Sequence, residues 1–226
     1  MQAVISSLAW VPIVESTRSL PISDGIAPRC VRLESTRIQR KRFFVEFGVA
    51  SGRELSNTYL LEKEYGWDGI VAEPAKCWHD SIRRSRSCAI ETRCVWKDTG
   101  SKLVFNVSIV GELSTLDSFS ANDIHADFRK SGGERHEVET ISLIDLLTTH
   151  NAPPVIDYLS IDTEGSEFEI LSAFDFGKFQ FRVITCEHNM SETRGLLFDL
   201  LTSQGYERVR TDLSKCDDWY VKKSID

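Results

Sequence analysis

The chain has 226 residues, of which 41% are hydrophobic and 27% are charged. A chain of this length buries one sizeable core and leaves little room for a second full domain. Its formal net charge of -7 disfavours a nucleic-acid backbone as the main partner, because such binding depends on clustered Lys and Arg. We therefore expect one globular domain, in which only a local basic patch could serve nucleic acid.

The cysteine pattern and the hydropathy of the chain indicate the compartment in which it works. The six cysteines form no C-x-x-C pair and show no metal-finger spacing, which favours reduced thiols over a disulfide framework. The chain shows neither a basic leader nor a run of about 18 apolar residues. We expect a soluble, cytoplasmic protein that does not enter a membrane.

An alternation of strands and helices begins near residue 41, after a stretch without sustained periodicity. Residues 1–40 mix Pro, Ser and Arg, so we treat them as an N-terminal extension to a domain spanning 41–226. The apolar spacing that follows predicts strand, helix, strand, helix and strand at 43–47, 57–66, 69–74, 77–85 and 89–96. This order predicts parallel strands joined by right-handed crossovers.

The middle of the chain departs from this alternation. Residues 103–110 alternate between apolar and polar, as an exposed edge strand does. Residues 111–137 are polar and contain Gly132 and Gly133, so we expect a mobile insertion there.

The alternation then resumes and ends in a hairpin. The pattern predicts strand, helix, strand and helix at 156–162, 167–174, 181–187 and 193–204. Two closing strands, at 206–211 and 218–223, are too close in sequence for a crossover connection. They should therefore form an antiparallel hairpin.

Four acidic residues stand at the C-terminal ends of predicted parallel strands: Glu46, Glu73, Asp162 and Glu187. Ligands of open α/β sheets bind at that edge of the sheet. Each acid alone is explained as well by capping a helix or by bonding a loop. Their common placement favours a binding site.

The first turn favours a cationic adenosyl ligand over a dinucleotide. Gly48 and Gly52 lack the third glycine of G-x-G-x-x-G, and Glu46 before the turn would repel a diphosphate. Glu73 ends the second strand, where it can accept both hydroxyls of a ribose. S-adenosylmethionine is an adenosyl ligand with positive charge and no phosphate. An ordinary tight turn is the alternative explanation of the glycine pair.

Several sequence blocks carry a family resemblance. The blocks SNTYLLEKEYGWDGIVAEP (residues 56–74) and IDTEGSEFEIL (residues 161–171), together with CVWKDTGSKLVFN and GELSTL between them, resemble the successive motifs of the FkbM-family methyltransferases. The resemblance implies an α/β, Rossmann-like class I methyltransferase fold: a seven-stranded, mostly parallel sheet with an antiparallel last strand and helices on both faces. It also implies O-methylation of a hydroxyl on a sugar or another small-molecule acceptor, with S-adenosylmethionine as cofactor.

Carried over by position, the resemblance implies a cofactor site made of Glu46, Gly48, Val49, Gly52, Ser56, Asn57, Glu73, Pro74, Val95, Trp96 and Asp162. In that site Glu46 meets the methionyl amino group directly or through water, Glu73 binds the ribose, and Val95 and Trp96 are candidates for the adenine wall. Core packing is the alternative explanation of Val95 and Trp96. Plain helix capping explains Ser56 and Asn57 equally well. Asp98 is a candidate for reading the base, and Ser114 and Thr115 are candidates for ligand contacts from the insertion.

Transfer of a methyl group to an alcohol also requires removal of the hydroxyl proton. His188 is our first candidate for the base, because a histidine accepts a proton near neutral pH. A structural or surface histidine explains it about equally well. Asp162, Glu187 and Glu164 complete the predicted catalytic group. With Asn189, these acids could instead hold magnesium, and we favour the metal-free site over a metal held by Asp162 and Glu187.

Two other functions stay open from the sequence. N-methylation or RNA methylation on the same fold would be favoured by a basic face, for which Arg83, Arg84 and Arg86 are the only hint. A noncatalytic adenosyl-binding module would be favoured if His188 and the acids pointed away from the ligand. A small-molecule or carbohydrate acceptor remains our expectation.

Overall fold

The computed structural model describes residues 42–121, 125–130, 132–212 and 216–225. The predicted N-terminal extension, residues 1–40, lies outside the described residues. Within the described part, the chain forms a seven-stranded sheet and a four-stranded sheet. Every helix of that part is too short or too polar to span a bilayer.

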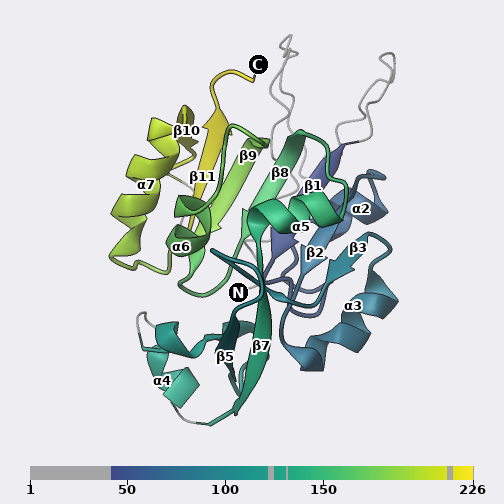
Figure 1. Cartoon of the computed structure of the whole chain (residues 1–226), viewed down its shortest axis with the longest axis vertical. Coiled ribbons are helices and arrows are strands. Elements are labelled where there is room, and N and C mark those ends of the chain that lie inside the picture. The colour runs from purple at the N-terminus through teal and green to yellow at the C-terminus, as the bar shows by residue number, and fades with distance from the viewer. Residues whose placement is uncertain (1–41, 122–124, 131, 213–215, 226) are drawn as a thin grey trace, which may run out of the picture. The chain divides into compact units, whose positions relative to one another are not determined.

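The seven-stranded sheet has the strand order β10-β11-β9-β8-β1-β2-β3 (Figure 1). Its strands are β1 (Phe43–Phe47), β2 (Asp68–Ala72), β3 (Ala89–Glu91), β8 (Val155–Ile161), β9 (Gln180–Glu187), β10 (Tyr206–Val209) and β11 (Asp217–Lys222). The five strands from β3 to β9 are parallel, and β11 is antiparallel to β9. β10 and β11 form the expected antiparallel hairpin, with Tyr206 opposite Lys222. The predicted mostly parallel sheet with an antiparallel last strand is confirmed.

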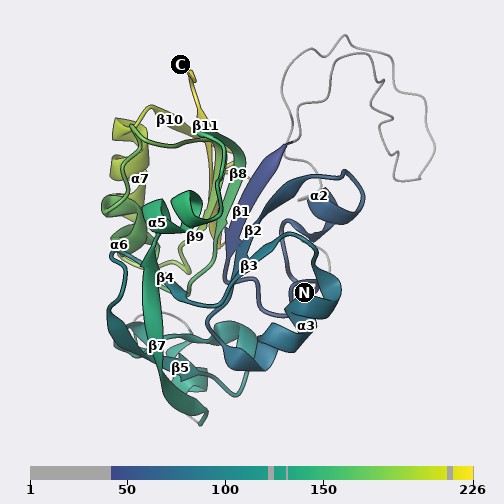
Figure 2. The same ribbon diagram turned by 45° about the vertical axis from the view of Figure 1, so that its right-hand side comes forward.

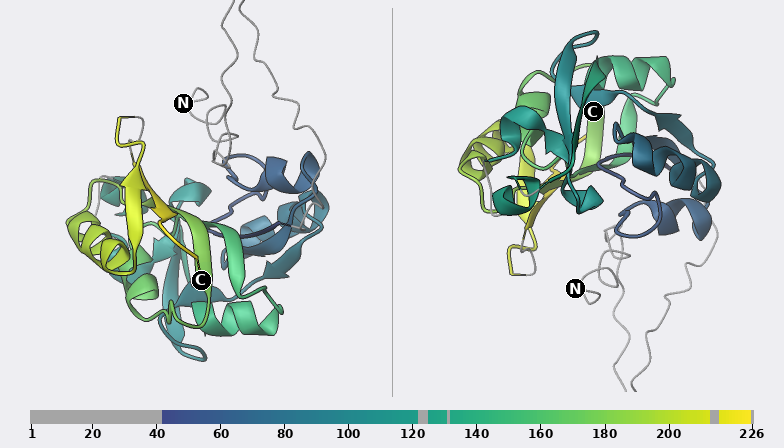
Figure 3. Two further views of the ribbon diagram at one scale, coloured as in Figure 1. Left: turned by 90° about the horizontal axis from the view of Figure 1, so that it is seen from above. Right: turned by 90° about the horizontal axis from the view of Figure 1, so that it is seen from below.

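Helices cover both faces of this sheet, as predicted (Figures 2 and 3). The short helices α2 (Tyr59–Lys63) and α3 (His79–Ser85), the second preceded by the 3-10 turn η1 (Lys76–Trp78), lie on one face. The other face carries α5 (Leu143–Thr149), α6 (Glu167–Ser172) and α7 (Thr193–Ser203). The strands between the two layers are apolar on both sides, and Val45, Ile70 and Leu159 are fully buried. The C-terminal ends of the parallel strands are therefore supported by a well-packed core.

The four-stranded sheet has the order β4-β7-β5-β6. It consists of β4 (Cys94–Trp96), β5 (Lys102–Val107), β6 (Thr115–Leu116) and β7 (Glu134–Ser142), with the 3-10 turns η2 (Gly111–Leu113) and η3 (Asp117–Phe119) and the helix α4 (Ala126–Lys130). The described residues of the predicted insertion, 111–137, include η2, β6, η3, α4 and the first part of β7, so the segment contains regular structure; its mobility stays a prediction. The prediction of an exposed edge strand was wrong, because β5 lies between β7 and β6.

The predicted third strand, 89–96, is two strands in two sheets. Glu91 causes the break, because its Oε1 accepts the backbone N–H groups of Thr92 and Arg93, at 3.0 Å each, and turns the chain away from β2. β3 therefore ends at Glu91, and β4 pairs with β7 in the smaller sheet. Helix α5 was not predicted from the sequence. Ser142 caps its start, because its side chain accepts the N–H of Asp145.

Candidate functional site

A cavity opens where the C-terminal ends of β1, β2 and β8 face the smaller sheet. On the side of the larger sheet it is lined by Phe47, Gly48, Ala50, Ala72, Glu73, Pro74, Asp162, Thr163 and Ser166. On the side of the smaller sheet it is lined by Cys94, Val95, Phe105, Gly111, Glu112, Ser114 and Leu116. Among these described lining residues, three are acidic and none is basic. The predicted ligand edge thus coincides with a cavity that favours neutral or cationic groups.

Gly48 lies where the ends of β1 and β8 approach each other closely. Its φ is +77°, a conformation that favours glycine. A Cβ atom built there would lie 1.5 Å from the carbonyl oxygen of Asp162. Any side chain at residue 48 would therefore push the ends of β1 and β8 apart.

Glu73 is held by the backbone of both loops that border the cavity. Its Oε2 accepts the N–H of Ala50 at 2.9 Å, and its Oε1 accepts the N–H of Ala75 at 2.8 Å. Each carboxylate oxygen keeps a further lone pair for a ligand hydroxyl. Burial, together with the nearby charge of Asp162, raises the pKa of Glu73 to about 7. Glu73 is therefore an oriented acceptor at the cavity wall, and its binding of a ribose stays a prediction.

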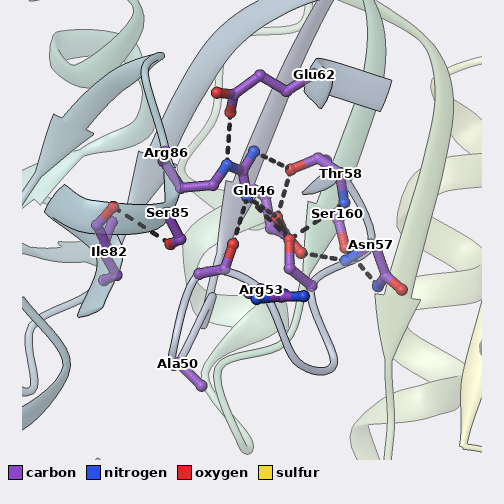
Figure 4. A network of polar contacts seen from close by, with 12 residues as sticks. Glu46, Ala50, Arg53, Asn57, Thr58, Glu62, Ile82, Ser85, Arg86 and Ser160 are labelled. Atoms are coloured by element: carbon purple, nitrogen blue, oxygen red, sulfur yellow. Dashed lines mark hydrogen bonds and ion pairs between the residues drawn. The ribbon is translucent and has the colours of Figure 1, made fainter. Parts of the chain in front are cut away.

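Glu46 does not line the cavity. Its carboxylate accepts the side-chain hydroxyls of Ser56 and Thr58, at 2.8 and 2.5 Å, and the N–H of Asn57 at 2.7 Å (Figure 4). The amide of Asn57 also donates to Ser160 Oγ at 2.9 Å. These bonds hold the loop after β1 on the side away from the cavity. Ser56 and Asn57 therefore bind Glu46 and are not among the lining residues.

The remaining predicted cofactor residues divide between the cavity and the core. Pro74 and Val95 line the cavity, and Val49, Gly52 and Trp96 do not. Trp96 packs edge-on against Phe119, with their ring centroids 5.9 Å apart. Asp98 accepts from Thr140 Oγ1 and also lies outside the lining. Trp96 belongs to β4, the half of the predicted third strand that joins the smaller sheet, and its side chain packs there.

Three acids meet at the ends of β8 and β9. Carboxylate oxygens of Asp162, Glu164 and Glu187 all lie within 4.8 Å of one another. Burial raises the pKa of Asp162 to about 7, while a hydrogen bond with Glu187 opposes this rise. Burial and the charge of Asp162 raise the pKa of Glu187 well above its ordinary value. Burial and mutual repulsion therefore favour the protonated forms of Asp162 and Glu187, and Asp162 brings that pair to the cavity wall.

Glu164 connects the smaller sheet to the acidic strand ends. Its Oε2 accepts from Arg129 Nη2 at 2.5 Å and from Asn189 Nδ2 at 2.9 Å. Arg129 comes from α4, and its side chain is fully buried. Thr115 in β6 also donates to the carbonyl oxygens of Thr163 and Glu164. Glu164 is thus committed to an ion pair and is poorly placed to act as the base.

Glu167 explains much of the IDTEGSE block. The side chain is buried at the start of α6, and its Oε1 accepts the N–H groups of Thr163 and Gly165 at 3.0 Å each. Glu164 within this turn has a positive φ of 59°. Left-handed conformations of residues with side chains cluster at ligand sites, where the surrounding structure maintains them. The block therefore encodes a fixed turn beside Asp162.

His188 is buried outside the cavity lining. Its Nδ1 accepts the N–H of Met190 at 3.1 Å, which places the proton of the neutral ring on Nε2. Nε2 lies 3.8 Å from Asp218 Oδ1, and Asp218 is paired with Arg194. Burial and the charge of Arg194 lower the pKa of His188. The ring therefore faces the C-terminal hairpin, and its role as base remains a prediction that this position does not favour.

Several residues of the cavity wall were not predicted from the sequence. Thr163 and Ser166 belong to the same block as Asp162, so their position was available from the motif. Phe105 and Glu112 reach the cavity only because the middle of the chain folds over the sheet edge. Ser114, a predicted ligand contact, does line the cavity.

Comparison with known protein families matches residues 46–216 to the methyltransferase FkbM domain. The chain belongs to this family. The match covers both loops that hold Glu73 and the whole acidic cluster. Methyltransferases of this kind use S-adenosylmethionine, in agreement with the cofactor expected from the sequence.

Solved structures with the same kind of fold are distant in sequence. The FkbM methyltransferase of Methylobacillus flagellatus KT is 12% identical, with a TM-score of 0.49, and the match covers 82% of this chain and 44% of that protein. A precorrin-6y C5,15-methyltransferase from Geobacter metallireducens GS-15 is 13% identical, with a TM-score of 0.42 and coverages of 82% and 80%. The N-terminal domain of human METTL16, solved with SAH, is 14% identical, with a TM-score of 0.38 and coverages of 80% and 60%. Comparison with curated proteins found no match.

Proposed function

We propose that this FkbM-family methyltransferase transfers the methyl group of S-adenosylmethionine to a hydroxyl of a small-molecule or carbohydrate acceptor. The observation that carries the proposal is the pairing, in one cavity, of an oriented ribose acceptor, Glu73, with a carboxyl of raised pKa, Asp162. The first belongs to the cofactor end of the cavity and the second to the reacting end.

The cofactor end is built mainly from backbone and from Glu73. Gly48 and Ala50 allow the adenosyl ligand to approach the main chain, and Glu73 accepts the ribose hydroxyls. Val95 and Phe105 supply apolar wall for the base. The cationic methionine end lies toward Asp162, because this acid is the one at the junction of β1 and β8.

At the reacting end, Asp162 takes the proton of the acceptor hydroxyl. The hydroxyl oxygen attacks the methyl carbon, the carbon–sulfur bond breaks, and its electron pair goes to sulfur, leaving a neutral thioether. A base whose pKa is near the working pH combines a useful ionised fraction with sufficient basicity. Asp162, with a pKa raised to about 7, meets this condition, and Glu187 can share the proton afterwards. We therefore prefer this pair to His188 as the base.

A magnesium ion at the acidic cluster is the second candidate mechanism. The cluster fits a hard cation, because Asn189 Oδ1 and Glu187 Oε2 are buried and find no hydrogen-bond partner among the described residues. Asp162, Glu164 and Glu187 would hold the ion, which would lower the pKa of the acceptor hydroxyl. Metal-free transfer remains our first choice, because Arg129 already compensates Glu164.

Methylation of nucleic acid finds little support in the described residues. The cavity lining contains no basic side chain, and Arg86 of the basic run is buried in ion pairs. Phosphate backbones are bound through exposed Lys and Arg. A neutral or cationic acceptor suits the lining better.

The proposal is tested by detecting methylated products with isotope-labelled S-adenosylmethionine against metabolite, glycan and RNA pools. We expect a labelled small molecule or glycan, formed with wild-type protein and lost with Asp162→Asn, since general-base catalysis is worth roughly 10²- to 10⁴-fold. Turnover that disappears with chelator and returns with magnesium would favour the metal mechanism. A labelled RNA product would contradict the acceptor class.

A further inference from the structure

Arg86 is a buried cation at the end of α3, in contact with the loop that follows β1. None of its side chain is exposed to solvent. Its Nη1 donates to the carbonyl oxygen of Gly52 and to Ser56 Oγ, at 3.2 and 2.9 Å, and its Nη2 donates to Thr58 Oγ1 at 2.8 Å (Figure 4). One guanidinium thus binds the loop at three positions. Only arginine presents enough donors in a fixed plane to do this.

Two glutamates share this cation. Arg86 Nε donates to Glu62 Oε2 at 2.5 Å, and Arg86 Nη1 lies 3.6 Å from Glu46 Oε2. Burial alone would raise the pKa of Glu62, but hydrogen bonds from Lys63, Arg86 and Ser87 hold it well below the ordinary value. Two cations and two carboxylates therefore balance in this cluster. The charge of Glu46 is neutralised by Arg86 and is not directed at a ligand in the cavity.

The loop held by Arg86 also forms the cofactor wall. Its first part, Gly48 and Ala50, lines the cavity, and the N–H of Ala50 orients Glu73. Its second part, from Gly52 to Thr58, is the part that Arg86 and Glu46 bind. The two parts are joined by only one residue, so displacement of the second part changes the first.

We propose that Arg86 is a positioning residue for the cofactor: with Glu46 it fixes the first loop so that Gly48, Ala50 and Glu73 present the shape that S-adenosylmethionine binds. The inference rests on the proposed cofactor site and concerns a residue outside that site. It also gives Glu46 an indirect role, as the partner of Arg86 and of three loop residues, in place of direct contact with the methionyl amino group.

The test is calorimetric titration of S-adenosylhomocysteine into Arg86→Met, well below the melting temperature of the variant. We expect affinity to fall by about tenfold or more, because a loop that Arg86 no longer holds must be ordered when the ligand binds. Arg84→Met, which removes an exposed arginine from the same helix, should bind as the wild type does. Leu201→Ala, a buried change in α7, is the stability control: it should lower the melting temperature and leave the affinity within about twofold.

Thr58→Val is the milder variant and serves if Arg86→Met does not fold. It keeps the arginine and removes one hydroxyl that joins Arg86 to Glu46. This variant should bind S-adenosylhomocysteine with an affinity several-fold lower than that of the wild type. The inference would be overturned if the folded Arg86→Met protein bound S-adenosylhomocysteine with wild-type affinity. If Arg86→Met is unfolded, wild-type affinity in Thr58→Val would overturn it. An equal loss of affinity in Leu201→Ala would also overturn it. No binding by the wild-type protein would instead contradict the cofactor site itself, and the inference with it.

Discussion

Single residues in this protein have roles that depend on backbone contacts as much as on side-chain chemistry. Gly48 matters because the carbonyl of Asp162 occupies the space of a Cβ atom. Glu73 matters because two backbone N–H groups aim its carboxylate. The sequence identified both residues, since their types and positions at strand ends were informative. It could not show that Glu46 faces a loop and an arginine, because partners distant in sequence decide the orientation of a side chain.

Gly48→Ala should be among the most damaging small substitutions in the chain. The clash with Asp162 requires the ends of β1 and β8 to separate, which we expect to cost about 3 kcal/mol or more of unfolding free energy, as overpacking adds to strain. Gly66→Ala is the matched control, with a φ of +65° and no atom within 4 Å of its Cβ. It should cost about 1 kcal/mol. If urea denaturation gave equal losses of unfolding free energy for the two variants, the close approach of Gly48 to Asp162 would be contradicted.

Glu73 makes cofactor affinity depend on pH. Ribose hydroxyls donate to the ionised carboxylate, so binding must favour the deprotonated form of a group whose pKa is raised to about 7 in the empty site. Affinity for S-adenosylhomocysteine should therefore rise between pH 6 and pH 8, over about one unit on either side of that value. The rise should be smaller in Glu73→Gln, measured by the same titration. A profile that is the same in both proteins would assign the pH dependence to another group.

At the scale of elements, the pairing of β4, β5, β6 and β7 into a second sheet is the part that the sequence did not predict. Its strands β5 and β7 pair over a long sequence separation, so local periodicity could not show that they lie together. The sheet contributes Phe105 and Leu116 to the cavity, and Arg129 ties it to Glu164. The segment predicted to be a mobile insertion therefore contributes part of the cavity wall.

Arg129→Met should separate that wall from the strand ends. It leaves Glu164 buried without its cation, a loss that typically costs about 3 to 5 kcal/mol. Lys130→Met is the control, since its side chain is largely exposed and its ion pair with Asp127 is at the surface. Urea denaturation should give a clearly lower free energy of unfolding for Arg129→Met than for Lys130→Met. Equal stability would mean that the ion pair with Glu164 does not hold α4 in place.

For the molecule as a whole, the order of strands fixes where chemistry can occur. The switch between β1 and β8 brings Gly48 beside Asp162, and the cavity opens at that point. The regular half of the sheet could be predicted, because buried parallel strands are apolar runs separated by helices. Glu91 ends β3 through local hydrogen bonds that periodicity does not reveal, so the sequence grouped Trp96 with the cavity wall, whereas its side chain packs against Phe119 outside the lining.

The central claim is that the cavity at this switch binds an adenosyl ligand through Glu73, and one calorimetric experiment tests it directly. S-adenosylhomocysteine and NAD are titrated into wild-type protein and into Glu73→Ala. We predict binding of S-adenosylhomocysteine to the wild type, and an affinity lower by at least about tenfold in the variant, since each charged hydrogen bond contributes about 1.5 to 3 kcal/mol. Tight binding of NAD without any response to S-adenosylhomocysteine, or equal affinity of the two proteins for S-adenosylhomocysteine, would contradict the account.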